Sequence, residues 1–283
     1  MMQKPFSASS LTFLKMKRIY LFIFLPVMLA LLCLQSCMPM ARARNYAVEQ
    51  ISCSKNDEEP SATMHYQCPI QTIVLRSSAD IILRQGTGTV VDIYRSDGIG
   101  SITLNGRSTR GNGVTCADGS LLVDGNRIDK VCVTTDLSQL RNIVVGGSGG
   151  VYADCIESPS LSGVLQGSGD ISIKKLKCSN VDVVLMGSGD FDIGSVECTS
   201  MNAVLRGSGD LDFANIKATS LTLLLQGSGD IDVIGIDCNS VNAVLQGAGD
   251  ITLRGTCRSF NATNQGAGDI NAGGLKTGRQ SVY

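Results

Sequence analysis

Between residues 161 and 257, apolar and polar side chains alternate in three short runs that recur about every 20 residues. One run ends just before a glycine-rich turn, a second begins just after it, and a third follows the second. Alternation at every second position over short segments predicts β-strands with one buried face. The apolar positions of the second run are Ile171 and Ile173, Phe191 and Ile193, Leu211 and Phe213, Ile231 and Val233, and Ile251 and Leu253. The pattern predicts three strands in each unit.

The turn between the first two runs is Gly-Ser-Gly-Asp or Gly-Ala-Gly-Asp in each unit. It begins at Gly167, Gly187, Gly207, Gly227, Gly247 and Gly266, and its aspartates are Asp170, Asp190, Asp210, Asp230, Asp250 and Asp269. A unit of this size cannot bury its apolar side alone, but stacked copies share a continuous core. Parallel connections are right-handed in nearly all proteins. The sequence therefore predicts an all-β fold, a right-handed parallel β-helix with 20-residue coils.

The residues of these turns have structural roles that follow from the stacking. We expect the glycines to adopt positive φ at the corners and to leave room for the turn of the next coil. The aspartates should form a column in which each carboxylate accepts hydrogen bonds from turn N–H groups. The alternative is bound calcium, since Asp192, Asp212 and Asp232 follow two residues after the turns. Calcium is the one cofactor that the sequence raises, and no other metal site is assigned.

The N-terminal segment has the features of a bacterial lipoprotein signal peptide. Residues 1–36 contain four basic residues and no acidic one, and their apolar run, 19–34, is shorter than the roughly 20 residues of a membrane-spanning helix. The run ends in Leu-Gln-Ser before Cys37, which resembles a lipobox with Cys37 as the acylated residue. An uncleaved membrane anchor remains the alternative.

The rest of the chain divides by its pattern into four segments. Residues 37–68 are polar and are expected to be a flexible tether. Residues 69–140 contain less regular strand patterns, including 74–83, which echoes the repeat, and are expected to cap the solenoid as an irregular β segment. The coils are expected over 141–273, followed by a C-terminal tail at 274–283.

Cysteines are expected in two roles. In an oxidising envelope, Cys53 with Cys68 and Cys116 with Cys132 are candidate disulfide pairs. The column formed by Cys178, Cys198, Cys238 and Cys257 occupies inward positions, where a thiol acts as a small apolar filler. Neighbours one coil apart in this column also have Cα atoms close enough for a disulfide.

Composition excludes several classes of function. The 283 residues contain 24 Lys and Arg against 25 Asp and Glu, so there is no basic footprint for nucleic acid. The single histidine, His65, excludes a site built from several histidines and is expected to be an ordinary residue of the tether. No catalytic residue is assigned.

These features together resemble one bacterial family. The lipoprotein signal, the segment 136–145 that ends an irregular β region, and the serial Gly-Ser-Gly-Asp turns are similar to the auto-transporter adhesin head GIN domain family of Bacteroidetes. The likeness covers about residues 70–270. It implies a right-handed β-helix, a surface or periplasmic location and an adhesive role, with no agreed catalytic residues. The cysteine column and Gly150, where the first turn would have aspartate, depart from the family pattern.

The sequence therefore favours a non-enzymatic cell-envelope lipoprotein with a β-helical, adhesin-like domain. Its expected location is the outer membrane of a Gram-negative bacterium, facing the periplasm or the surface. The expected partners are the membrane, through the lipid anchor, and a glycan or protein ligand. Two alternatives remain open: a polysaccharide-acting enzyme, because β-helices also carry lyases and hydrolases, and a purely structural envelope protein.

Overall fold

The structure is a computed structural model that describes residues 59–95, 103–104, 113–125 and 127–282. The chain divides into two compact units, residues 1–49 and 50–283, and every described residue belongs to the second. No helix in this described part is long and apolar enough to cross a membrane. The expected signal peptide, residues 1–36, and Cys37 lie outside the described residues.

The fold is all-β, with one short 3-10 helix, η1 (Leu137–Gln139), in the described part. The N-terminal region contains β1 (Ala62–Tyr66), β2 (Thr72–Leu75), β3 (Asp80–Gln85), β4 (Thr89–Tyr94), β5 (Thr103–Leu104), β6 (Gly113–Ala117), β7 (Ser120–Asp124), β8 (Lys130–Thr135) and β9 (Asn142–Val145). The coils that follow contain β10 (Val151–Glu157), β11 (Ser160–Leu165), β12 (Ile171–Lys177), β13 (Asn180–Leu185), β14 (Phe191–Leu205), β15 (Leu211–Leu225), β16 (Ile231–Leu245), β17 (Ile251–Asn264) and β18 (Ile270–Val282).

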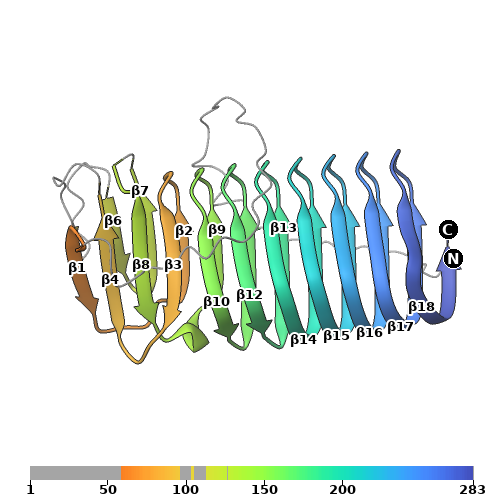
Figure 1. The fold of residues 1–283 in the computed structure, drawn as a ribbon, viewed down its shortest axis with the longest axis horizontal. Coiled ribbons are helices and arrows are strands. Elements are labelled where there is room, and N and C mark those ends of the chain that lie inside the picture. The colour runs from red at the N-terminus through yellow and green to blue at the C-terminus, as the bar shows by residue number, and fades with distance from the viewer. Residues whose placement is uncertain (1–58, 96–102, 105–112, 126, 283) are drawn as a thin grey trace, which may run out of the picture. The chain divides into compact units, whose positions relative to one another are not determined.

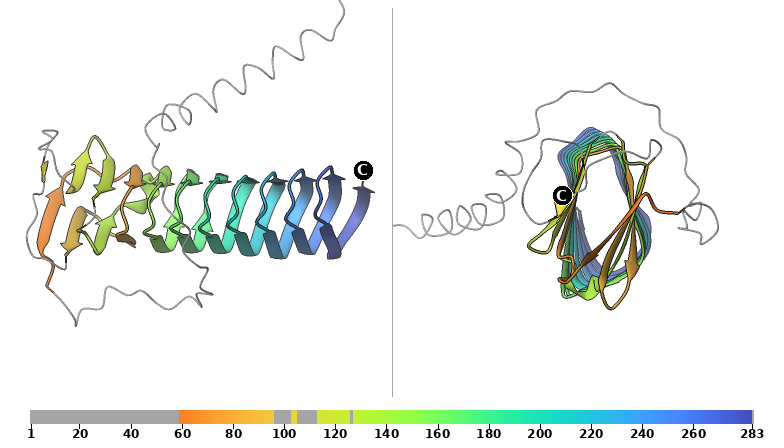
Figure 2. Two further views of the ribbon diagram at one scale, coloured as in Figure 1. Left: turned by 90° about the horizontal axis from the view of Figure 1, so that it is seen from above. Right: turned by 90° about the vertical axis from the view of Figure 1, so that its left-hand side faces the viewer.

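The predicted parallel β-helix is confirmed. Coils from β9 to β18 lie side by side in Figure 1, and the view along the stack in Figure 2 superimposes them as one flattened loop. Pairing between β14 and β15 is parallel with a 20-residue offset, as in Phe191↔Leu211. It has three uninterrupted segments, beginning at Phe191, Ser195 and Ser200, which correspond to the three predicted runs. The difference is that each later coil is one continuous bent strand, in which single residues such as Gly194 and Thr199 separate the three paired segments.

The core is a set of stacked apolar columns inside the loop. Leu185, Leu205, Leu225 and Leu245 form one column and are fully buried. Phe191 and Phe213 are the largest of the fully buried side chains. A Cβ at Gly163 would lie 2.6 Å from the ring of Phe191, so the glycine leaves space that the ring fills. Burial of these columns between coils is the main stabilising term, since one coil alone would leave them in water.

The turns at Gly247 and Gly266 are 19 residues apart instead of 20, and the missing residue is accommodated at one corner of the coil. Ile231 pairs with Ile251 at an offset of 20, whereas Ile236 pairs with Gly255 at an offset of 19. Gly255 has φ of +130°, a conformation that glycine adopts without steric cost. The shorter coil therefore stays in register with its neighbours on both sides of the deletion.

The irregular N-terminal cap is also confirmed, and part of it already follows the path of the coils. β2 and β3 pair in parallel with β9 and β10, so that Leu75 lies opposite Val145 and Ile81 opposite Val151. Farther from the repeats, β4 pairs antiparallel with both β1 and β8, and β6 pairs antiparallel with β7. These antiparallel strands end the stack on the N-terminal side.

Two expected boundaries are wrong. The tether, 37–68, overlaps β1, whose Met64 is buried, because the alternation of Ala62, Met64 and Tyr66 gives this short polar segment one apolar side. The tail, 274–283, belongs mostly to β18, which pairs with β17 up to Val282. Main-chain pairing needs no apolar side chains, and this allows a glycine-rich sequence to form a further coil.

Candidate functional site

The turn aspartates form a hydrogen-bonded column along the stack. The main-chain N–H of Asp190 donates to Oδ1 of Asp170 at 2.9 Å, and the same bond links every later pair of turns at 2.7–3.0 Å. The column begins earlier, because the N–H of Gly150 donates to Oδ1 of Asp80 at 2.9 Å. Each carboxylate is thus held by the backbone of the next coil. This geometry is the hydrogen-bonded arrangement that the sequence favours over calcium.

The glycines of these turns are required by close approach between coils. A Cβ on Gly207 would overlap the carbonyl oxygen of Gly187 and lie 2.9 Å from Cδ2 of Leu185. Equivalent overlaps occur at Gly167, Gly187, Gly227, Gly247 and Gly266. The expectation of positive φ at these corners is wrong, since none of these glycines lies in the left-handed region. Lack of space for a side chain is therefore the reason for glycine here.

Gly150 departs from the repeat because a neighbouring ring occupies the space. A Cβ at Gly150 would lie 2.5 Å from Cζ of Tyr152. Tyr152 is aligned with Ser172, whose smaller side chain stands beside a turn that carries an aspartate, Asp170. The ring of Tyr152 thus takes up the space beside Gly150, and Gly150 offers no carboxylate to the N–H of Asp170.

A second column of carboxylates, Asp192, Asp212 and Asp232, stands beside the turn column. Burial and then the neighbouring Asp212 raise the pKa of Asp192 to about 7. Burial and then Asp232 raise the pKa of Asp212 to about 6. Burial also raises the pKa of Asp210 in the turn column. Among the described residues, no group of three or more His, Cys, Asp or Glu side chains is arranged to hold a metal ion.

The two expected disulfide pairs are wrong. Cys68 and Cys116 are free, and Cys132 is disulfide-bonded to neither of them. Cys116 lies on β6, which pairs with β7, whereas Cys132 lies on β8 between β3 and β4. Burial raises the pKa of the Cys116 thiol to about 11, so it stays protonated. Cys53 lies outside the described residues.

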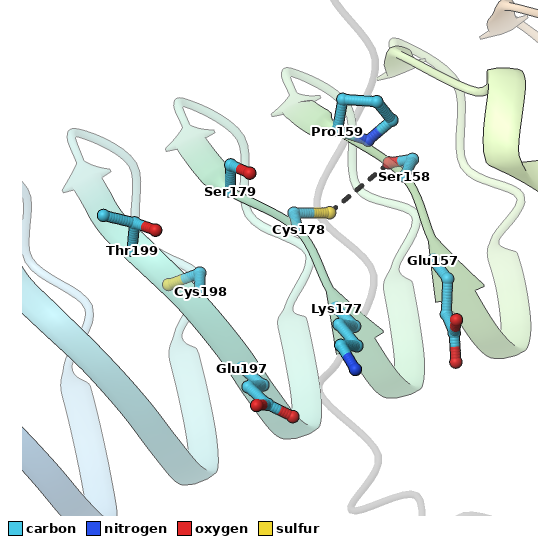
Figure 3. A pocket seen from close by; sticks show the side chains of 9 residues that line it. All are labelled: Glu157, Ser158, Pro159, Lys177, Cys178, Ser179, Glu197, Cys198 and Thr199. Carbon is cyan, nitrogen blue, oxygen red and sulfur yellow. Dashed lines mark hydrogen bonds between the residues drawn. The ribbon is translucent and has the colours of Figure 1, made fainter.

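A groove follows one corner of the coils. We call it the corner groove, and it is lined by residues 157–159, 177–179, 197–199, 217–219 and 237–239. It contains a cavity of about 470 Å³ over the first three of these segments and one of about 250 Å³ over the last three. The two cavities share Glu197 and Cys198, so they adjoin. Figure 3 shows the larger cavity, with side chains from three successive coils around it.

One wall of the corner groove alternates in charge from coil to coil. Glu157, Lys177, Glu197, Lys217 and Asp237 are exposed and occupy paired positions on successive strands. Opposite charges on paired positions attract weakly, by about 0.2–1 kcal/mol per pair. Sequence reasoning missed this wall, although alignment of the repeats on their turns shows the alternation. The other side of the groove carries the exposed hydroxyl groups of Ser179, Thr199 and Thr219.

The cysteine column forms the floor of the corner groove. Cys178 and Cys238 are buried, Cys198 is half-buried, and Ala218 stands between Cys198 and Cys238. The sulfur of Cys178 lies 3.3 Å from Oγ of Ser158 (Figure 3). Burial raises the pKa of the Cys198 and Cys238 thiols to about 11. The expected role as apolar fillers fits the buried members, while Cys198 is accessible from the groove.

A ladder of polar side chains runs along another face. Nε of Arg206 donates to Oε1 of Gln226 at 2.9 Å, and Nε2 of Gln226 donates to Oε1 of Gln246 at 2.8 Å. Gln246 continues the ladder to Gln265 at 3.1 Å. These side chains are exposed but are engaged with one another. His65, for its part, is exposed on β1.

Several solved structures from Bacteroidetes have similar folds. A "putative adhesin" from Bacteroides fragilis is 22% identical over 80% of this chain and 100% of that chain, with a TM-score of 0.60. A "putative adhesin" from Parabacteroides merdae is 14% identical over 78% and 94% of the two chains, with a TM-score of 0.57. A "putative lipid binding protein" from Parabacteroides distasonis is 14% identical over 77% and 96%, with a TM-score of 0.51. At these identities the likeness shows the fold alone.

No curated protein matches the sequence. Residues 71–234 and 212–283 match a family profile, and together they span most of the chain. The chain belongs to the family described as "putative auto-transporter adhesin, head GIN domain".

Proposed function

We propose that the protein is a non-enzymatic lipoprotein of the Gram-negative outer membrane, anchored through Cys37, whose β-helix binds a linear glycan in the corner groove. The observation that carries the proposal is the pair of adjoining cavities that follow the stack. Their volumes are near or within the range of small-molecule sites, about 300–1,000 Å³. A groove that follows the stack presents hydroxyl groups in successive coils on one side and charges that alternate from coil to coil on the other, which suits a repeating polymer.

The chemistry of the groove supports a glycan in particular. The hydroxyl groups of Thr199 and Thr219 are exposed on one side, and charged groups such as Lys177 and Glu197 stand on the other. Hydroxyl, ammonium and carboxylate groups together can donate to and accept from sugar hydroxyls. On the floor of the groove, the half-buried Cys198 provides apolar contact for the face of a sugar ring.

A glycan array tests the proposal. The labelled chain without its signal peptide is expected to retain a set of linear glycans. Lys177→Glu is expected to weaken that binding at least tenfold, because it places like charges in three successive coils. Lys175→Glu is the matched control, since Lys175 is exposed on the same strand but does not line the groove. An array without retained glycans, or equal loss in both variants, contradicts the proposal and favours a purely structural protein.

The non-enzymatic part of the proposal depends on where the titratable groups lie. Asp192 and Asp212 have the pKa values, about 7 and about 6, that would suit acid and base roles in polysaccharide cleavage. Neither residue lines the corner groove or the cavity at the last coil. We therefore expect no new reducing ends when acidic polysaccharides are incubated with the protein. Cleavage that is lost in Asp192→Asn would favour the enzyme instead.

Lipid binding is a second candidate, favoured by one cavity. A space of about 600 Å³ at β17 and β18 is lined by Phe260, Ile270 and Leu275 on one part and by the polar Asn264, Asp269 and Asn271 on the rest. One structural relative carries the name of a lipid-binding protein. An acyl chain would contact the apolar part of this lining, and the volume is within the range of small-molecule sites. A fatty acid with a fluorescent group would then bind to the chain, and Ala262→Trp, which fills the cavity, would abolish its binding.

A further inference from the structure

Like charges recur at every second coil along one wall of the corner groove. The wall consists of Glu157, Lys177, Glu197, Lys217 and Asp237, each paired with the next on adjacent strands. The sign of the charge changes at every step, and all five side chains line the two cavities. The alternation ends at Thr256, which pairs with Asp237. The charge pattern within the cavities therefore has a period of two coils.

The opposite side of the groove has a shorter period. Exposed and uncharged polar side chains stand there at positions 20 residues apart, namely Ser179, Thr199, Thr219 and Asn239. Hydroxyl and amide groups both donate and accept hydrogen bonds, so they can bind a sugar whatever its charge. One side of the groove thus offers the same kind of contact in every coil, while the other side distinguishes odd coils from even ones.

The charges of the wall are available to a ligand. Lys174 and Asp154, one coil apart on β12 and β10, form an ion pair at 2.6 Å outside the groove. Within the described part of the chain, none of the wall side chains forms an ion pair, although each has an opposite charge one coil away. Figure 3 shows Glu157, Lys177 and Glu197 extending on the same side of three successive coils. A bound polymer would therefore meet these charges directly.

The spacing of the coils indicates which polymer matches the wall. Strands in a sheet are about 4.8 Å apart, so Lys177 and Lys217, two coils apart, are separated by about 9.6 Å along the stack. A pyranose ring in an extended glycan advances by nearly the width of one coil, and a disaccharide therefore spans two coils. An extended peptide repeats its side chains on one face about every 6.8 Å and falls out of step with the coils. The period of the wall thus favours a disaccharide repeat over a peptide.

We propose that the corner groove selects a linear glycan whose sugars carry a carboxylate and an ammonium group in alternation, an inference that rests on the proposed glycan-binding function. The carboxylates face Lys177 and Lys217, and the ammonium group between them faces Glu197. A glycan with a carboxylate on every sugar would place one against Glu197, and a glycan with an ammonium group on every sugar would place one against each lysine. Like charges in contact are unfavourable, so the wall rejects both uniform polymers.

The test compares glycans of equal length with different charge patterns. An octasaccharide of hyaluronan carries a carboxylate on alternate sugars, and its N-deacetylated form has the same backbone with an ammonium group on the sugars between. Fluorescence polarisation of the end-labelled glycans, recorded at pH 6 where the amino groups are charged, measures their affinity for the full chain. We expect the N-deacetylated form to bind at least tenfold more tightly than hyaluronan and than an octamer of galacturonic acid, which has a carboxylate on every sugar.

A charge swap separates the pattern of the wall from its net charge. The double variant Lys177→Glu/Glu197→Lys keeps the composition of the wall but places like charges on paired positions at both ends of the swap. Its preference for the N-deacetylated form over hyaluronan should fall to about twofold or less. Lys174→Asp/Asp154→Lys is the matched control, because it swaps an exposed ion pair outside the groove, and it should keep the preference. Thermal melts show whether both variants remain folded.

The outcomes distinguish this inference from the function on which it rests. Binding of none of the octasaccharides, together with an array that retains no glycan, contradicts the proposed function and this inference with it. Equal affinity of the wild-type chain for the three octasaccharides leaves glycan binding in place but overturns selection by charge pattern, and this comparison requires no variant. The inference is also overturned if the swap within the groove keeps the preference, or if the control swap loses it equally.

Discussion

The main-chain N–H of Asp210 donates a 3.0 Å hydrogen bond to Oδ1 of Asp190, one coil earlier in the stack. The carboxylate of Asp210 in turn accepts a 2.7 Å bond from the N–H of Asp230. The four inner turn aspartates, from Asp190 to Asp250, are therefore both donors through the backbone and acceptors through the side chain. The column joins neighbouring coils at the corner where no apolar side chain holds them together.

Removal of one carboxylate should weaken the stack at one step. In Asp210→Ala the N–H of Asp230 loses its acceptor, and we expect the free energy of unfolding to fall by about 1–2 kcal/mol. Asp210→Asn keeps an oxygen at the same place and should retain most of the stability. Urea denaturation measures the difference. Ser208→Ala, which changes an exposed side chain in the same turn, is the control and should alter stability by less than about 0.5 kcal/mol.

A side chain on a turn glycine should cost more than the loss of one hydrogen bond. Gly207→Ala places a Cβ into the carbonyl oxygen of Gly187, and because that atom belongs to the backbone, the coils must separate. We expect a loss of about 3 kcal/mol or more, in the range of severe steric strain. Gly88→Ala is the control, since a Cβ there would meet nothing within 4 Å. Equal melting temperatures for the two variants would contradict the close approach.

The turns and coils could be predicted because stacking places the same physical requirement on the equivalent residue of every coil. Gly187 and Gly207 recur for the same steric reason, and Leu185 and Leu205 recur because both face the same core. Such a pattern shows where glycine is required, but it does not show which φ angle the glycine adopts. Glycine was consequently expected at positive φ, whereas the cause of glycine at Gly207 is the carbonyl oxygen below it.

The cap and the groove could be predicted less well because their contacts are not repeated. Nothing local in the sequence shows that β6 pairs with β7 and β8 with β3, and so the sequence predicts Cys116 and Cys132 as partners. The sulfur of Cys178 lies against the hydroxyl of Ser158, and serine occupies this position of the column in one coil only. A feature that occurs in one coil only leaves no repeating pattern in the sequence, so it can be recognised only from the structure.

Stability should fall as the pH rises through neutrality. The pKa of Asp192 is about 7 in the folded chain, above the unfolded value of 3.8, so the folded chain keeps a proton between about pH 4 and 7 that the unfolded chain has lost. This contribution is fully present below about pH 4 and is lost as the pH rises to 7. After allowance for solvent screening it amounts to about 1–2 kcal/mol. The melting temperature should therefore be higher at pH 5 than at pH 8.

Asp192→Asn should remove much of this dependence, because the amide stays neutral throughout. At pH 8 the variant is expected to be more stable than the wild-type chain, and at pH 4 the two should be similar. Asp182→Asn, at an exposed carboxylate on β13, is the control and should leave the pH profile unchanged. A wild-type profile that rises from pH 5 to pH 8 would show that the carboxylate column is ionised in the folded chain.

Lipid attachment can be tested apart from the fold. Cys37 is the expected acylation site, and Cys37→Ser should yield a chain that incorporates no radiolabelled fatty acid in cells. Several acyl chains give stable anchoring, whereas their absence leaves nothing to hold the chain at the membrane. The variant should therefore move from the membrane fraction to the soluble fraction. Label that persists in Cys37→Ser refutes the assignment, and Cys33→Ser is the matched control.

The first turn, which has Gly150 in place of an aspartate, allows a test in which one more aspartate is added to the column. Gly150→Asp alone should destabilise the protein, because its Cβ meets the ring of Tyr152. Tyr152→Ser alone removes that ring and introduces the residue found at position 172, the paired position on the next coil. In the double variant the new carboxylate has space and can accept the N–H of Asp170, which extends the column by one step.

We expect the double variant to be more stable than the sum of the two single changes predicts, by about 1–2 kcal/mol. Urea denaturation of all four chains gives this coupling energy directly. Gly150→Ala with Tyr152→Ser repeats the cycle without a carboxylate and isolates the steric part. If both cycles give the same coupling, relief of the clash accounts for all of it, and the hydrogen bond between successive turn residues contributes nothing measurable to the stability of the stack.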